Sequence, residues 1–146
     1  VLEALEIVYA KDNVIKIFDA QVKTVNKDSY TFYNAFDGGL AFEFRGPGLW
    51  GPISGIISLE KDLKTIRKIK ITYQEETPGL GSRIGDQDYL KTFKNKEVLP
   101  RLVFVAEGTS KQKYEVDAIT GATGSSRALE KLINENVQRY LSALKG

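Results

Sequence analysis

The stretch Asp117-Ala118-Ile119-Thr120-Gly121-Ala122-Thr123-Gly124-Ser125-Ser126 joins a predicted strand to the clearest helix pattern in the sequence. Gly124, Ser125 and Ser126 are residue types that suit a helix cap. Beyond them, apolar residues recur at spacings of three and four as far as about Lys145, which predicts one apolar stripe on an amphipathic helix. The stripe consists of Leu129, Leu132, Ile133, Val137, Tyr140, Leu141 and Leu144. The quoted stretch is therefore predicted to be a strand end, a turn of small residues and a helix start.

Strand patterns dominate the rest of the chain. Helical spacing predicts a short helix over Val1 to Tyr9, and an acidic start predicts another over 88–93. Alternating apolar residues predict strands at 18–25, 30–36, 40–44, 53–60, 65–73, 101–107 and 114–119. Gly-rich and Pro-rich segments predict turns or loops at 37–39, 45–52 and 75–85, and residues 61–64 are the expected turn between two predicted strands. We expect one α+β domain spanning residues 1–146, with a twisted, largely antiparallel sheet, flanking helices and a long C-terminal amphipathic helix.

Composition excludes several function classes. The 146 residues include no Cys and no His, which removes disulfides, iron–sulfur ligation, thiolate zinc sites and His-based catalytic triads. We accordingly expect no metal site and no catalytic residue. The net charge is only +2 and the basic residues are scattered, which argues against a nucleic-acid partner. No apolar run approaches the ~20 residues that span a bilayer. Because the sequence starts at Val1 and contains no Met, we expect that an upstream segment, an anchor among the candidates, is missing.

The turn before the last helix offers suitable chemistry for a phosphate. A helix N-terminus presents unpaired N–H groups and partial positive charge. Gly121 and Ala122 leave the backbone open to close approach, Thr120 and Thr123 add hydroxyls, and Asp117 adds a carboxylate. An ordinary strand-to-helix turn with Ser and Thr caps explains the same residues, as does a generic phosphate site. The residue chemistry alone does not specify a flavin.

The pattern Asp117-x-x-Thr120-Gly121-Ala122-Thr123 resembles the flavinylation motif of the RnfG/NqrC family, Asp-x-x-(Ser/Thr)-Gly-Ala-Thr. Two further blocks are similar to that family and stand in its order: Gly48-Leu49-Trp50-Gly51 and Glu76-Thr77-Pro78-Gly79-Leu80-Gly81. The resemblance covers roughly Phe44 to the C-terminus. It departs after the motif, where relatives commonly have a large apolar residue followed by Thr and Ser, and this chain has Gly124, Ser125 and Ser126.

The resemblance implies a covalent cofactor. In the family the final Thr of the motif is esterified to the phosphate of FMN by a separate flavin transferase, so Thr123 is the expected attachment residue. Asp117 is then the motif acid that the transferase reads, and Thr120, Gly121 and Ala122 complete the motif. Further cofactor contacts are expected at Glu76, Thr77, Gly79, Leu80 and Trp50. Alternatively, Pro78-Gly79 is simply a type II turn and Trp50, the only Trp, is a core residue.

The same resemblance implies an electron carrier that is not catalytic alone. The family's complexes couple electron flow between ferredoxin or NADH and an acceptor to Na⁺ or H⁺ transport. An N-terminal helix anchors the domain in the inner membrane with the domain on the extracytoplasmic side, and the partners are the other subunits and the transferase. The compact chain favours the Rnf type over the Nqr type. Two alternatives remain: a noncovalent FMN- or phosphate-binding module of another reductase, and an unmodified structural extracytoplasmic domain.

Overall fold

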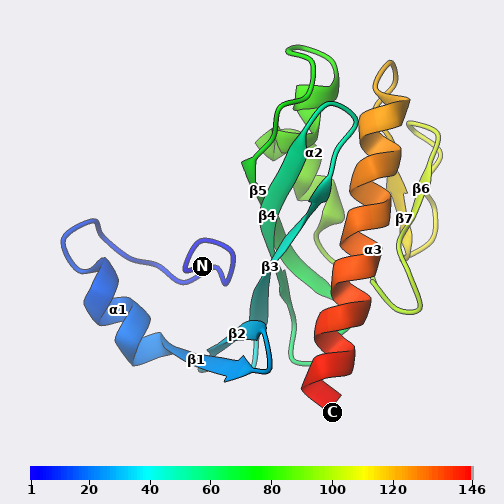
Figure 1. Cartoon of the computed structure of the whole chain (residues 1–146). Coiled ribbons are helices and arrows are strands. Elements are labelled where there is room, and N and C mark those ends of the chain that lie inside the picture. Colours follow the sequence, from blue (N-terminus) through cyan, green and yellow to red (C-terminus); the bar gives the residue numbers. More distant parts are fainter. Residues whose placement is uncertain (146) are drawn as a thin grey trace.

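Five strands form one antiparallel meander, in which each strand pairs with its neighbour in the sequence (Figure 1). The computed structural model describes residues 1–145. The strands are β1 (Val22–Lys27), β2 (Tyr30–Ala35), β3 (Leu40–Pro47), β4 (Pro52–Leu59) and β5 (Ile66–Tyr73). The hairpin turn predicted at 37–39 joins β2 to β3, and the turn predicted at 61–64 joins β4 to β5. The predicted α+β class is confirmed.

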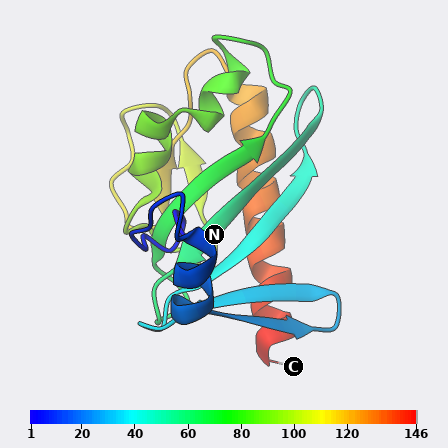
Figure 2. The ribbon, with the colours of Figure 1, turned by 90° about the vertical axis from the view of Figure 1, so that its left-hand side faces the viewer.

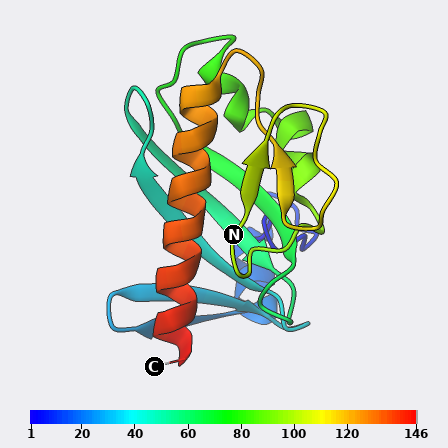
Figure 3. The same ribbon diagram turned by 90° about the vertical axis from the view of Figure 1, so that its right-hand side faces the viewer.

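The long helix α3 (Thr123–Lys145) crosses one face of the sheet (Figure 3). Its apolar stripe is buried, as the spacing predicted, against the inward side chains of β3 and β4. Tyr140 stacks on Phe42 with ring centroids 4.4 Å apart and meets Tyr30 and Phe32 edge to face. This apolar layer is the main core, and it fixes where the helix begins relative to the ends of the strands.

The N-terminal segment and helix α1 (Val14–Gln21) lie on the opposite side of the sheet from α3 (Figures 2 and 3). Leu2 and Leu5 are buried there against Val22, Ala35 and Ala41 in a second, smaller apolar cluster. Both faces of the sheet are therefore covered at this end, one by a long helix and the other by a short strap of chain.

A third layer follows β5. It contains the 3₁₀ helix η1 (Gly81–Gly85), the short helix α2 (Gln87–Leu90) and the 3₁₀ helix η2 (Lys91–Phe93). Strands β6 (Val103–Val105) and β7 (Glu115–Asp117) then pair in parallel beside α3. Both are shorter than the sequence predicted. Side chains of α3 bind backbone groups of β6 and of the residue before it: Asn134 Oδ1 accepts from the Leu102 N–H at 2.8 Å and Glu130 Oε2 from the Phe104 N–H at 2.6 Å.

Two predictions near the N-terminus are wrong. Val1 to Tyr9 forms turns and no helix, since the chain reverses at Glu6, whose φ is 58°, to bury Leu2 and Leu5. Residues 18–21 belong to α1 and not to a strand, because Ile17 and Phe18 pack into the second cluster as one helical face. At the other end of the chain, Gly124, Ser125 and Ser126 lie inside the first turn of α3 and do not cap it, because the helix begins at Thr123.

Candidate functional site

Three loops meet at the end of the molecule where α3 begins, at the top of Figure 1. The first, residues 48–51, joins β3 to β4; the second, residues 74–80, leaves β5; and the third, residues 118–122, leads from β7 into α3. These loops contain the three blocks that resemble the RnfG/NqrC family. The fold therefore brings together segments that are well separated in the sequence.

The carboxylate of Glu76 connects the second loop with the first loop and with the start of α3. Its Oε1 accepts hydrogen bonds from the backbone N–H of Leu49 at 2.9 Å and from the Ser125 hydroxyl at 2.7 Å. Its Oε2 accepts from the backbone N–H of Trp50 at 2.9 Å. The residue is only 4% exposed. One buried side chain of the second loop thus fixes both the first loop and the first turn of α3.

The environment of Glu76 favours its charged form. Burial raises the pKa of the carboxyl, but the hydrogen bonds from Ser125, Trp50 and Leu49 outweigh that penalty and leave the pKa below its ordinary value. The donors are a hydroxyl and two backbone amides, so the anion is stabilised by dipoles and not by a basic side chain. In this structure Glu76 therefore holds its loop in place, and its predicted contact with a cofactor stays a prediction.

The motif residues form a tight turn into α3. Gly121 has φ of 81°, a left-handed conformation that a side chain would strain, so the Gly of the motif is required by the backbone. Ala122 is buried, and its carbonyl accepts from the Ser126 N–H at 2.9 Å to start the helix. The Ser126 hydroxyl accepts from the Ile119 N–H at 3.1 Å. Thr120 and Thr123 remain exposed, with Thr123 as the first residue of α3.

Two charged residues that the sequence reasoning missed hold this turn from either side. Arg83 of η1 donates from Nη2 to the Thr120 carbonyl at 2.6 Å, and Glu107 Oε1 accepts from the Thr120 N–H at 3.0 Å. They also line an open hollow of about 460 Å³ next to Ile119. Arg83 brings a permanent positive charge to the motif turn. No local pattern could have found it, because its partner lies 37 residues away.

Asp117 is turned toward a neighbouring loop. Its Oδ1 accepts from the Ser110 N–H at 3.0 Å, and its carbonyl oxygen accepts from the Tyr89 hydroxyl at 2.8 Å. Burial raises the pKa of the Asp117 carboxyl, but hydrogen bonds from Ser110 and Gly108 outweigh it and lower that pKa overall. Its contacts order the approach to the motif turn, which is a structural role. Recognition by a transferase stays a prediction.

Large apolar side chains are exposed on the first two loops. Trp50 is 69% exposed, which contradicts the alternative that it is a core residue, and Leu49 and Leu80 are also exposed. The predicted turn at Pro78-Gly79 is present: the Leu80 N–H donates to the Thr77 carbonyl at 3.0 Å, and Gly79 has φ of 74°. Thr77 and Gly79 are exposed as well. The two loops therefore present apolar side chains beside the start of α3, as a surface for a planar ligand would require.

Gly124, where the sequence departs from the family pattern, has a packing reason. A Cβ built on Gly124 would lie 2.6 Å from Leu49 Cδ2, so the Leu49 side chain occupies the space that a larger residue would need. The first loop thus covers the first turn of α3 through Leu49 as well as through Glu76. The departure changes which side chain fills this contact and leaves Thr123 accessible.

Comparison with known proteins agrees with this geometry. The model of the FMN-binding domain family matches residues 48–138, which include all three loops. The NqrC protein of the Na⁺-translocating NADH-quinone reductase of Chlamydia trachomatis is 30% identical over 126 residues, covering 72% of this chain and 40% of the relative. The chain thus spans about 40% of the length of the curated relatives it matches.

Two crystal structures share the fold. The NqrC protein of the Na⁺-translocating NADH-quinone reductase from Parabacteroides distasonis aligns with a TM-score of 0.81 and 24% identity, covering 99% of this chain and 89% of that one. NqrC of Shewanella oneidensis aligns with a TM-score of 0.64 and 24% identity, covering 90% and 73%. The family match over most of the chain, with its motif blocks gathered at one end of the fold, leads to one conclusion: this chain belongs to the FMN-binding domain family, as its resemblance to RnfG and NqrC indicated.

Proposed function

We propose that this chain carries FMN through a phosphoester to Thr123 and transfers electrons as the NqrC component of a Na⁺-translocating NADH:quinone reductase. The observation that carries the proposal is the placement of Thr123. It is the final residue of the motif, it is exposed, and it opens α3 beside the two other family loops. Its hydroxyl is thus accessible both to a modifying enzyme and to the cofactor.

The surroundings of Thr123 suit the two halves of a flavin nucleotide. The start of a helix and the guanidinium of Arg83 favour a phosphate next to the motif turn. The exposed side chains of Leu49, Trp50 and Leu80 offer apolar contact to a ring system. An aromatic ring and a phosphate on one ligand would therefore both find partners at this end of the molecule.

The protein's part in electron transfer is to hold the cofactor in one place. FMN supplies the ability to take up one or two electrons. Thr123 would keep it on this protein between turnovers, and Glu76 keeps the surrounding loops in fixed positions through its three hydrogen bonds. No acid, base or metal ligand of the chain is needed for that role.

The relatives favour the Nqr type over the Rnf type that the compact chain had suggested, since those described above are all NqrC proteins. As partners we propose the other subunits of such a complex and a flavin transferase. Among residues 1–145, no helix has the length and hydropathy to cross a membrane. From the resemblance to the family, and not from this finding, we also propose a membrane anchor and a location of the domain on the extracytoplasmic side.

The test is the intact mass of denatured protein after coexpression with a flavin transferase. We expect a gain equal to FMN minus one water, because the Thr123 hydroxyl loses its proton as its oxygen bonds to the flavin phosphorus, and the phosphorus loses one of its own oxygen substituents in exchange. Thr123→Ala should abolish the gain, whereas Thr123→Ser, which keeps a hydroxyl, should retain it. Fragmentation of the modified peptide should place the added mass on residue 123 and not on Thr120 or Ser125.

Two other outcomes would replace the proposal. Unmodified mass together with flavin released on denaturation would indicate a noncovalent FMN- or phosphate-binding module. Unmodified, colourless protein would indicate a structural domain. A mass gain that persists in Thr123→Ala would move the attachment to another residue and refute the role given to Thr123.

A further inference from the structure

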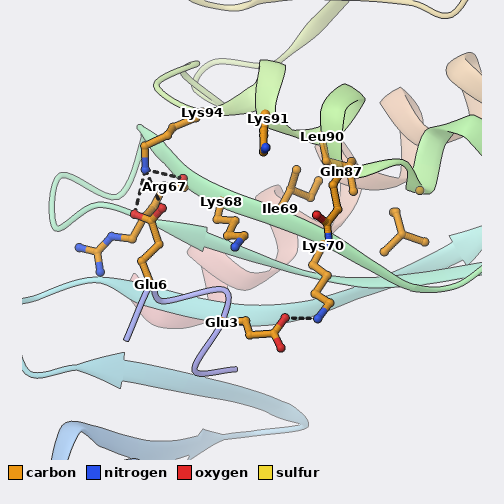
Figure 4. Close-up of a pocket in the computed structure, with 12 residues that line it drawn as sticks. Glu3, Glu6, Arg67, Lys68, Ile69, Lys70, Gln87, Leu90, Lys91 and Lys94 are labelled. Carbon is orange, nitrogen blue, oxygen red and sulfur yellow. Dashed lines mark hydrogen bonds and ion pairs between the residues drawn. The ribbon is translucent and has the colours of Figure 1, made fainter. Parts of the chain in front are cut away.

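A cleft of about 530 Å³ opens between β5, the short helices α2 and η2, and the N-terminal segment (Figure 4). Its floor is apolar and consists of Ile69 and Ile71 of β5 and Leu90 of α2. None of its lining residues belongs to the motif turn at 117–123. The proposed flavin site does not use this cavity, which we call the cationic cleft because of the side chains on its rim.

Four lysines stand around the cationic cleft: Lys68, Lys70, Lys91 and Lys94. Two of them are neutralised by the N-terminal segment, since Lys70 pairs with Glu3, and Lys94 pairs with Glu6 at 2.8 Å. The side chain of Arg67 points out of the cleft, toward Glu60 and Asp37.

The other two lysines, Lys68 and Lys91, form no ion pair with the described residues of the N-terminal segment. Lys68 is exposed and makes no ion pair with any carboxylate in the described part of the chain, residues 1–145. Lys91 reaches only the solvated carboxylate of Asp88, at 3.9 Å. Exposed pairs of that kind contribute little, so Lys91 is nearly as available as Lys68. The cleft therefore has an excess of positive charge next to an apolar floor.

The chain's own N-terminal segment shows how an acidic peptide binds beside this cleft. Leu2 and Leu5 turn inward and are buried, while Glu3 and Glu6 reach the lysines of the rim. The Leu5 carbonyl also accepts from Arg67 Nη1 at 3.1 Å. The segment Leu2-Glu3-Ala4-Leu5-Glu6 thus places its glutamates on the rim of the cleft while its leucines are buried in the second apolar cluster beside it.

From this arrangement we infer that the cationic cleft binds an acidic, partly apolar peptide segment of a partner protein, with its carboxylates on Lys68 and Lys91 and an apolar side chain over Ile69 and Leu90. A nucleic acid suits the cleft poorly, because Glu3 and Glu6 already pair with Lys70 and Lys94, and the two remaining lysines do not form the extended basic stripe that a phosphate backbone requires. A small ligand that needs fixed hydrogen bonds suits it poorly too, because the polar groups on the rim are flexible side chains. The inference holds whether or not Thr123 carries flavin.

The experiment measures fluorescence anisotropy of a short labelled peptide that repeats the order Leu-Glu-Ala found at residues 2–4, titrated with the full chain. We expect saturable binding that weakens with added salt. The double variant Lys68→Glu/Lys91→Glu should lower the affinity about tenfold or more. The control Lys113→Glu/Lys131→Glu changes the net charge equally at exposed lysines outside the cleft and should leave the affinity unchanged. Amide NMR shifts should cluster at 68–71 and 87–94.

Several results would overturn the inference. The peptide could fail to bind, or it could bind equally well when its glutamates are replaced by glutamines. The two double variants could weaken binding to the same extent, which would indicate only the overall charge of the protein. Tighter binding of a single-stranded oligonucleotide than of the peptide would show that the cleft favours a nucleic acid and that the inferred class of partner is wrong.

Discussion

Glu76 and Arg67 are the two charged side chains that are buried among residues 1–145, and they stand near opposite ends of β5. Glu76 follows the strand and is surrounded by neutral donors from the site loops. Arg67 lies near the start of the strand and is paired with two carboxylates, Glu60 at 2.6 Å and Asp37 at 3.2 Å. The chain thus uses two different ways to bury a charge.

The difference concerns what happens to the partners when the charge is removed. The carboxylates of Glu60 and Asp37 are partly exposed, so water can solvate them without Arg67, and the buried partner that would lose its donor is the Leu5 carbonyl. The Ser125 hydroxyl is buried and would lose its acceptor without Glu76. Leaving buried polar groups unsatisfied costs more than breaking a pair whose members reach solvent. The stability of the loops at the candidate site therefore depends on Glu76 more strongly than the start of β5 depends on Arg67.

The largest effect is expected from Glu76→Gln. The amide keeps the shape but turns an N–H group toward one of three donors, so the free energy of unfolding should fall by about 2–4 kcal/mol. Urea denaturation measures this loss, and Thr123 flavinylation should fall with it. The neighbouring, exposed Glu75→Gln is the matched control and should change stability by less than about 0.5 kcal/mol. Equal losses in both variants would show that burial of the Glu76 carboxylate is unimportant.

The pH dependence of stability provides a second prediction for the Glu76→Gln variant. The pKa of Glu76 is lowered in the folded state, so its contribution is fully present above the ordinary value of 4.5 and is lost as pH falls through the folded pKa. The stability difference between wild type and Glu76→Gln should therefore shrink in acid. A difference that grows in acid would mean that the carboxyl is protonated in the fold.

A smaller effect is expected from Arg67→Met. It removes both ion pairs and the donor to the Leu5 carbonyl but leaves the carboxylates access to water, so we expect a loss of about 1–2 kcal/mol in urea denaturation. Flavinylation at Thr123 should be unchanged. Arg45→Met, which breaks the exposed pair with Glu43, serves as the control and should change stability by about 0.5 kcal/mol or less. A greater loss for Arg67→Met than for Glu76→Gln would reverse the comparison.

The smallest change in stability is expected from Arg83→Ala, because this side chain is only partly buried. We expect about 0.5–1 kcal/mol from the lost bond to the Thr120 carbonyl. Its effect should appear instead in the rate of FMN attachment by purified transferase, followed by intact mass, with a decrease of about threefold to tenfold. Arg83→Lys keeps the charge and should restore part of that rate. An unchanged rate in both variants would limit Arg83 to packing.

Sequence patterns predicted the fold where the signal was long and regular. The stripe from Leu129 to Leu144 repeats over many turns, and it predicted α3 to within a few residues. The pattern failed at 18–21, because Phe18 and Ala20 suit a strand face as well as a helix, and Ile17 and Phe18 pack into the second cluster from a helix; residues 22–25 of the same prediction do lie in β1. The parallel pairing of β6 with β7 was not predicted, because pairing direction depends on distant parts of the chain.

The sequence predicted the segments that form the candidate site but not the hydrogen bonds that join them. The three blocks were recognised, and the fold gathers them at one end. The bonds of Glu76 to Leu49, Trp50 and Ser125 cross 27, 26 and 49 residues, and no local pattern contains such distances. Arg83 and Glu107 were missed for the same reason. The roles of Thr77, Gly79, Leu80 and Trp50 toward a cofactor stay predictions.

The bond between Ser125 and Glu76 also has a consequence for biosynthesis. The strands of the sheet are neighbours in the order of synthesis, so the meander can pair as the chain emerges from the ribosome. The loops at 48–51 and 74–80, in contrast, acquire their last contacts only when α3 docks, which requires residues as far as Leu141. A modifying enzyme that recognises the assembled turn would therefore meet its substrate only after most of the domain has been translated, so the proposed modification would report that folding has succeeded.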